Sequence, residues 1–127
     1  MIVWSRYKYF KEREFDSPDA PGSGVIIDEE LVKKLNLMRL FYKSPIHINS
    51  GVRTEQQNKK VRGSKNSAHV KGFAVDIPVH DSHARYKMIT LAHIVGFRRI
   101  GVYDKHVHLD NDPTKPQEVI WHGKRKN

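Results

Sequence analysis

The sequence predicts an α+β fold in which helices pack on one face of a small, largely antiparallel sheet. Two long segments carry apolar residues at helical spacing, and several short segments alternate apolar and polar residues as strands do. Two of the expected strands are separated only by Asp104 and Lys105, and a turn that short makes its flanking strands antiparallel. With 127 residues and no internal repeat or linker, the chain fits a single domain, 1–127.

The first 24 residues are expected to form an N-terminal arm and a loop. Residues 1–15 mix aromatic and basic side chains and could hold one strand or an irregular arm, whereas turn-forming residues dominate 16–24. A helix is expected over 28–42, because its apolar residues recur every three or four positions and Asp28 can cap its first turn.

The rest of the chain is expected to alternate strands with helices. Gly96 predicts the end of the second long helix, since glycine commonly closes a helix in the left-handed conformation. Basic residues close the chain and predict a tail over 122–127. The expected elements are, in order, a strand over 46–49, a helix over 54–61 capped by Thr54, a loop over 63–71, a strand over 73–79, a helix capped by Asp81 or Ser82 that runs to about 95, strands over 98–103 and 106–109, and a strand over 118–121.

Composition limits the chemistry that this chain can perform. It has no cysteine, so disulfides, thiolate metal sites and cysteine nucleophiles are excluded, and any metal would need His, Asp or Glu ligands. The net charge of +9 favours polyanionic partners, which could be nucleic acid, anionic lipid, teichoic acid or acidic wall peptides, and no nucleic-acid motif accompanies the charge. No apolar run approaches the roughly 20 residues of a membrane helix, and the N-terminus has no signal-peptide pattern, so no membrane insertion is expected.

Two histidines near the C-terminus form the first candidate site. His106 and His108 are two positions apart in an expected strand, so they share a face with Asp110, while Val107 and Leu109 face the core. Two imidazoles and a carboxylate on one face suit a metal site with a supporting side chain. The same pattern alone also fits an exposed polar face.

A second pair of candidates comes earlier in the chain. In the expected strand 73–79, Asp76 lies on the face opposite to the apolar residues, and a buried carboxylate is costly without a partner. A metal could be that partner. His69 precedes this strand on a loop that contains Gly72, and the loop can fold back over the strand. Taken alone, His69 also fits a surface loop.

Three separated segments resemble one family, in the order in which that family has them. Residues 67–76 match the Ser-x-His-x-x-Gly-x-Ala-x-Asp signature of the zinc D-Ala-D-Ala carboxypeptidase and L-alanyl-D-glutamate endopeptidase family, peptidase family M15, at every fixed position. Residues 48–58 are similar to its Ser-Gly-Tyr-Arg-Ser-x-x-x-Asn segment. Residues 100–110 resemble its Gly-Ile-Gly-x-Tyr and Val-His-x-Asp ending, so the resemblance covers roughly residues 28–110.

The resemblance implies a role for five residues of this chain. His69, Asp76 and His108 would be the ligands of a zinc ion. Arg53 would hold the substrate near the scissile bond, and it can do so through two parallel donors to a carboxylate or an oxyanion. Ser67 would contact the substrate or order the loop that carries His69.

The catalytic base is where the chain departs from the family. Many members place Asp or Glu three positions before the last ligand, and this chain has Lys105 there. In related peptidases with a His-x-His pair, the first histidine binds the attacking water or the oxyanion, and His106 occupies that place. Asp104 and Asp110 are the alternative candidates for the base.

The activity implied by the resemblance is hydrolysis of a peptide bond in the stem peptides of bacterial peptidoglycan. A basic single-domain chain without a signal peptide fits a phage or prophage endolysin, expected to be a monomer that is made in the cytoplasm and acts on the cell wall after release. A D-Ala-D-Ala carboxypeptidase or dipeptidase would share the metal site. A non-catalytic, zinc-stabilised cell-wall-binding or virion component stays open because of Lys105. Trp121 and His122 are the residues outside the motifs expected to wall a substrate groove.

Overall fold

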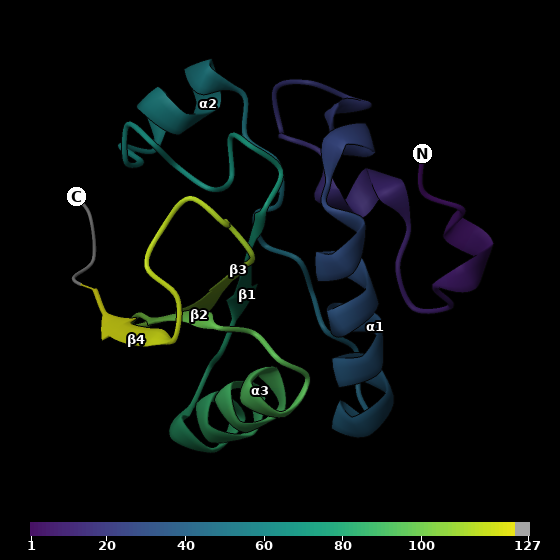
Figure 1. Ribbon diagram of the computed structural model, residues 1–127, viewed down its shortest axis with the longest axis vertical. Helices are drawn as coiled ribbons and strands as arrows, with labels where there is room; N and C mark the ends of the chain where they lie inside the picture. The colour runs from purple at the N-terminus through teal and green to yellow at the C-terminus, as the bar shows by residue number, and fades with distance from the viewer. Residues whose placement is uncertain (124–127) are drawn as a thin grey trace.

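The computed structural model describes residues 1–123 and confirms the α+β fold (Figure 1). The strands expected from the sequence at 73–79, 98–103, 106–109 and 118–121 are all present, with ends that differ by at most one residue. The expected basic tail begins inside the last strand, and 124–127 lie outside the described residues. The elements are η1 Trp4–Arg6, η2 Glu12–Phe15, η3 Ser23–Ile26, α1 Glu29–Tyr42, α2 Glu55–Lys60, β1 Ala74–Pro78, α3 Ser82–Ile94, β2 Arg99–Val102, β3 His106–Asp110 and β4 Val119–His122.

The four strands form one sheet in the order β1-β3-β2-β4. Strand β3 pairs antiparallel with β1 and with β2, whereas β4 pairs parallel with β2. One register row crosses the whole sheet, with Asp76, His108, Gly101 and Trp121 as successive partners. Residues paired in this way project from the same face of a sheet, so the row brings side chains from four strands together.

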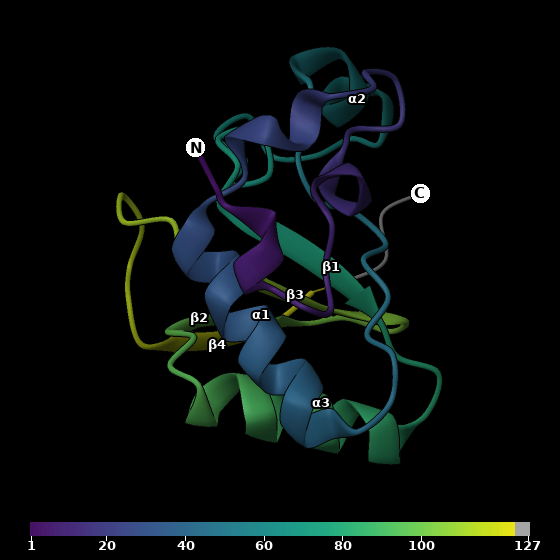
Figure 2. The ribbon, with the colours of Figure 1, turned by 90° about the vertical axis from the view of Figure 1, so that its right-hand side faces the viewer.

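Helices α1 and α3 supply the apolar layer against the sheet. In Figure 2, α1 crosses in front of the strands and α3 runs below them. Their apolar residues share one buried cluster with the core-facing residues of the strands. On β1 and β3 these residues are Val75, Ile77, Val107 and Leu109, and none is more than 1% exposed. The opposite face of the same two strands is therefore left for polar side chains.

The N-terminal arm is irregular and contains no strand. Residues 1–15 form two short 3₁₀ turns, and Phe10 and Phe15 are buried in the main core. Trp4 packs against the Phe15 ring at a centroid distance of 5.7 Å. The arm is thus part of the packed domain, because its aromatic residues gain more from burial than from exposure to water.

The prediction of a strand over 46–49 is wrong. Ile46 and Ile48 are buried and the residues between and after them are exposed, so the alternation exists without a strand. Alternation reports that one side of an extended segment is buried, and it does not require a hydrogen-bonded neighbour. At the end of the segment, the Asn49 N–H donates to the carbonyl of Asp76 at 2.9 Å, and an isolated bridge joins Ser50 to the same residue. That bridge ties the segment before α2 to the centre of β1.

The predicted helix caps are present. Asp28, Thr54 and Asp81 accept hydrogen bonds from backbone N–H groups in the first turns of α1, α2 and α3. This resolves the start of α3 in favour of Asp81 as the cap. Gly96 follows α3 with a φ of 98°, a left-handed conformation that favours glycine. None of the helices within residues 1–123 combines the length and apolarity that crossing a membrane requires.

Candidate metal centre

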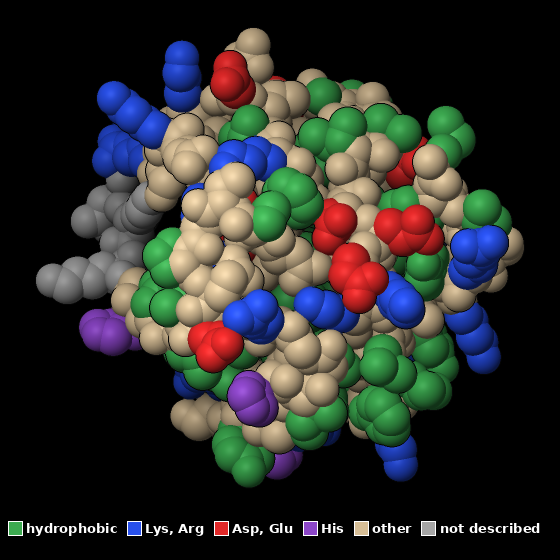
Figure 3. Space-filling view, in the orientation of Figure 1, with side chains coloured by type: hydrophobic (Ala, Val, Ile, Leu, Met, Phe, Trp, Pro, Cys, Tyr) green, Lys and Arg blue, Asp and Glu red, His purple; other side chains and the backbone are tan. Residues whose placement is uncertain are grey.

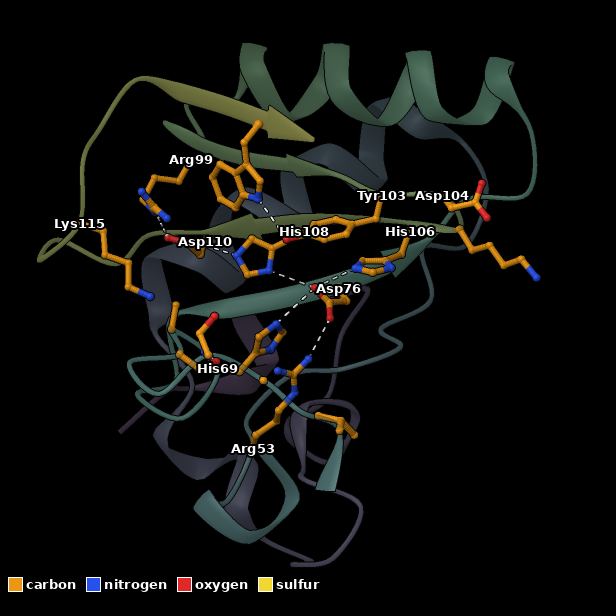
Figure 4. Close-up of a pocket in the computed structure, with 17 residues that line it drawn as sticks. Arg53, His69, Asp76, Arg99, Tyr103, Asp104, His106, His108, Asp110 and Lys115 are labelled. Carbon is orange, nitrogen blue, oxygen red and sulfur yellow. Dashed lines mark hydrogen bonds and ion pairs between the residues drawn. The ribbon is translucent and has the colours of Figure 1, made fainter. Parts of the chain in front are cut away.

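Three of the predicted residues converge on the polar face of the sheet (Figure 4). Asp76 and His108 are direct partners at the centres of β1 and β3, and His69 reaches them from the loop before β1. One potential ligand atom from each residue lies within 4.8 Å of the other two. Asp76 Oδ1 is 3.2 Å from His69 Nε2 and 3.1 Å from His108 Nδ1.

The tautomer of His69 follows from its other ring nitrogen. Nδ1 lies 2.8 Å from the carbonyl oxygen of Gly51, and a carbonyl can only accept, so Nδ1 carries the proton and donates it. In the neutral ring, Nε2 then has a lone pair directed at Asp76. Burial lowers the pKa of His69 and keeps the ring neutral, which is the form that binds a metal.

His108 is oriented in the opposite sense. Its Nε2 lies 2.6 Å from Asp110 Oδ2 and donates to that carboxylate, which leaves Nδ1 toward Asp76. Asp110 is itself fixed, because its other oxygen accepts from Arg99 Nε at 2.7 Å. Burial alone would lower the pKa of His108, but the hydrogen bonds with Asp110 and Asp76 raise it.

The donor set fits a metal ion. His69 Nε2, His108 Nδ1 and Asp76 Oδ1 are three acceptor atoms that face one another, and their lone pairs repel unless a cation or a proton lies between them. Burial would raise the pKa of Asp76, yet the charge and hydrogen bonds that His69 and His108 supply when a proton lies between them hold it well below its usual range, so the carboxylate is ionised. Two imidazoles and one carboxylate, with hydrogen-bonded partners behind both imidazoles, are typical of zinc sites that keep a position open.

Arg53 lies against the metal-binding cluster. It donates from Nη2 to Asp76 Oδ2 at 3.1 Å, from Nη1 to Asn58 Oδ1 and from Nε to Ser50 Oγ, the last two at 3.2 Å. The structure therefore places this guanidinium where it fixes the carboxylate ligand. Ser67 Oγ accepts from the backbone N–H of His69, so of the two roles expected for Ser67 the contacts match ordering of this loop.

His106 lies beside the cluster without joining it. Its Nε2 is 3.8 Å from Asp76 Oδ1, and its ring stacks on Tyr103 at 4.5 Å between centroids with an interplanar angle of 8°. Burial lowers the pKa of His106, which favours a neutral ring. Asp104 and Lys105 are exposed at the turn before β3 and line the rim of the same pocket.

An aromatic wall closes one side of the pocket, and the sequence revealed only half of it. Trp121 Nε1 donates to the Tyr103 hydroxyl at 3.0 Å, and the Trp121 ring lies 5.6 Å from that of His108. Gly101 permits this arrangement, because a Cβ there would lie 2.8 Å from both aromatic rings. Trp121 lines the pocket as expected, but His122 is exposed and does not.

The pocket residues that were not anticipated include Arg99, Tyr103 and Lys115. Strand parity offered a signal for Arg99, which shares a face with Gly101 two positions later. No local pattern marked Lys115, because it reaches the pocket from the loop between β3 and β4.

The fold and the His-Asp-His cluster together define an α+β domain with a candidate metal site on the polar face of its sheet. The family model described as Peptidase M15 matches residues 8–110, and the chain belongs to that family of metal-dependent peptidases. The match begins earlier than the motifs indicated and includes the arm that packs into the core. No curated protein matches the sequence.

Proposed function

We propose that this metallopeptidase is a zinc enzyme that hydrolyses peptide bonds in the stem peptides of bacterial peptidoglycan, as an endolysin-type endopeptidase of phage or prophage origin. The convergence of His69, Asp76 and His108 within 4.8 Å, in a chain of the Peptidase M15 family, carries the proposal. When bound, zinc supplies a Lewis acid that polarises a peptide carbonyl and makes water a nucleophile near neutral pH.

His106 is the residue assigned to proton transfer. Its ring stands 3.8 Å from the carboxylate ligand, faces the pocket and is held by stacking on Tyr103. Within residues 1–123, no hydrogen bond to its ring nitrogens competes with substrate or water. A neutral imidazole in this position can accept a proton from water and deliver it to the leaving amine.

The alternative bases are less suitable. Both carboxylate oxygens of Asp110 are occupied, one by His108 and the other by Arg99, so this residue orients His108. Asp104 is exposed on the turn. Arg53 acts mainly by fixing Asp76, and its remaining N–H groups can stabilise negative charge that develops on the substrate.

The surface charge supports a cell-wall target. The chain carries a net charge of +9, and Figure 3 shows basic side chains spread over the visible face instead of gathered in one patch. A diffuse positive surface attracts an anionic polymer without a defined binding groove, and the attraction weakens with salt. We expect a monomer that acts on the wall after its release from the cytoplasm.

Mass analysis of fragments released from purified peptidoglycan by the zinc-loaded protein tests this function. We expect new amine and carboxyl ends within the stem peptide. A fully loaded protein that releases no fragment would support the non-catalytic alternative, and release of terminal D-alanine alone would identify a carboxypeptidase.

The role of His106 is tested separately. His106→Ala is expected to keep its zinc and to lose about 10²–10⁴-fold in rate, the usual worth of a general acid–base group. His83→Ala, on the exposed side of α3, is the matched control and should behave as the wild type. Normal turnover by His106→Ala would move the role to another residue.

A further inference from the structure

The pocket around the metal-binding cluster contains more positive than negative side chains. Its lining includes four cationic residues and three carboxylates. Two of the carboxylates, Asp76 and Asp110, are buried and paired with cations behind the cluster. A ligand in the pocket would therefore bind the cationic side chain whose N–H donors are not already used within the protein. The four cations are Arg53, Arg99, Lys105 and Lys115.

Three of these cations are less suited than the fourth to binding a second charged group of the substrate. Arg53 uses three of its five N–H groups on Ser50, Asn58 and Asp76, and it lies against the metal-binding cluster itself. Arg99 donates to Asp110 and, at 2.6 Å, to the carbonyl of Pro116, and its guanidinium lies 4.9 Å over the Trp121 ring. Lys105 is exposed at the turn before β3, where water screens its charge.

Lys115 differs from the other three. Its side chain is 21% exposed, and its closest acidic partner, Asp112 Oδ2, lies 3.7 Å away. That same oxygen is already bound by Lys71 Nζ at 3.1 Å, and the other oxygen of Asp112 accepts from Thr114. Two lysines thus share one carboxylate, which leaves about one positive charge in excess.

The loop that presents Lys115 is built to hold it there. Asp112 is fully buried, and the Gln117 amide donates both to the carbonyl of Asp112 and to that of Lys115. The bond from Arg99 to Pro116 fastens the next residue of the loop to β2. In Figure 4, Lys115 and His106 flank the metal-binding cluster from opposite sides. These bonds hold the backbone at Lys115, and its side chain extends from there into one end of the pocket.

We propose that Lys115 binds a free carboxylate of the peptide substrate and makes this enzyme specific for an anionic peptide. The inference rests on the proposed peptidase function and adds the charge of the substrate to it. Lys115 lies outside residues 8–110, the part of the chain that matches the family model. An ammonium in a partly desolvated pocket forms a charge-assisted hydrogen bond with a carboxylate, and an amide cannot replace that bond equally well.

Two carboxylates of a stem peptide could serve as the ligand. One is the C-terminal carboxylate, and the other is the α-carboxylate of a γ-linked D-glutamate inside the stem. Four synthetic peptides separate them: the free acid, its C-terminal amide, its isoglutamine form and the doubly amidated form. For each peptide we would measure kcat/KM with the zinc-loaded enzyme and the Kd of the corresponding cleavage products.

We expect the wild type to prefer one acid over its amide by about 10-fold or more in kcat/KM, with a similar ratio in product Kd. Lys115→Gln should abolish the preference by slowing the acid alone, and Lys115→Arg should preserve most of it. Lys105→Gln removes the same charge from the exposed rim and should change the ratio less than 2-fold.

The outcomes distinguish this inference from the proposed function. Cleavage of stem peptides with equal ratios in the wild type and Lys115→Gln would overturn the role of Lys115 and leave the peptidase function intact. Equal losses in Lys115→Gln and Lys105→Gln would also overturn it, because they would indicate general electrostatic attraction. If no peptide is cleaved, the product Kd values still test the role of Lys115. Loss of the preference for the acid product in Lys115→Gln would support carboxylate binding by Lys115, and an unchanged preference would refute it.

Discussion

The two faces of strands β1 and β3 are built on different principles. One face consists of buried apolar side chains, and the other carries Asp76, His106 and His108. Apolar contacts are non-directional, so several combinations of residues of similar volume could fill the first face. The second face depends on directed hydrogen bonds of 2.6–3.2 Å. Each side chain of the metal-binding cluster is held in turn by a hydrogen bond to a residue outside the cluster. A shift of register by one residue would exchange the two faces, so the apolar face keeps the polar one in place.

The strongest way to break this comparison is to remove ligands from the polar face alone. The double variant His69→Ala, His108→Ala should lose bound metal and all measurable hydrolysis while it still folds. Its control, His83→Ala with His93→Ala, removes two exposed histidines of α3 and should keep one metal ion per chain. Elemental analysis checks both, and undiminished metal in the first variant would exclude this ligand set.

The converse experiment perturbs the apolar face of β3. Leu109→Ala removes a fully buried side chain and should lower the free energy of unfolding by about 2–5 kcal/mol, as is typical of large-to-small core substitutions. Below its melting temperature the variant should still bind one metal ion, since the partner bonds of His108 remain. Ile120→Ala on β4 is the exposed control and should cost less than about 0.5 kcal/mol. A thermal melt with a metal assay measures both quantities.

A smaller effect on metal binding is expected from a change at Asp110, the residue that orients His108. Asp110→Asn keeps the shape of the side chain but weakens acceptance of the His108 proton, and it leaves the buried Arg99 charge unbalanced. We expect a 10–100-fold loss in metal affinity, the usual effect of removing such an outer partner. Competition with a chelator measures it. An affinity equal to that of the wild type would show that the orientation of His108 does not depend on Asp110.

The smallest effect concerns the loop that follows β3. Burial alone would raise the pKa of Asp112, but hydrogen bonds from Thr114 and Lys71 lower it to about 2. A depressed pKa in the folded state stabilises the protein above the unfolded value of about 4, and this stability is lost as pH falls through about 2. Asp112→Asn should therefore lower the free energy of unfolding by about 1–2 kcal/mol at pH 7. The difference in this free energy between the variant and the wild type should shrink as the pH falls from 4 to 2.

Denaturant titrations at several pH values check this prediction. The exposed Asp104→Asn is the control and should show no such convergence with the wild type. A constant difference for Asp112→Asn across the range would mean that ionisation of this carboxyl does not stabilise the fold.

The sequence predicted the parts of the site that lie in short motifs. Strand parity and the order of three motifs were enough to group His69, Asp76 and His108, and the structure brings these three together. The same parity argument failed at 46–49, because the segment is buried on one side although only its last residue, Asn49, bonds to the backbone of β1. Local patterns report which side of a segment is buried, and they do not report what lies across from it.

Contacts between distant segments were beyond prediction. The ion pair of Arg53 with Asp76 spans 23 positions, and no local pattern predicted this contact. The substrate-binding role expected for Arg53 stays a prediction. The parallel return of β4, which brings Trp121 beside His108, depends on the course of the preceding loop. Lys115 lies on that loop, whose course is fixed by Arg99 and Gln117.

The position of the His69–Asp76–His108 cluster also affects chain topology. The chain has no cysteine, and Asp76 and His108, which share this centre, are 32 positions apart. A metal bound there acts as a reversible cross-link that restricts the unfolded chain, with a loop-closure contribution of about 3–4 kcal/mol if it behaves as a disulfide of that span does. Unlike a disulfide, such a cross-link survives in a reducing solution and is removed by a chelator.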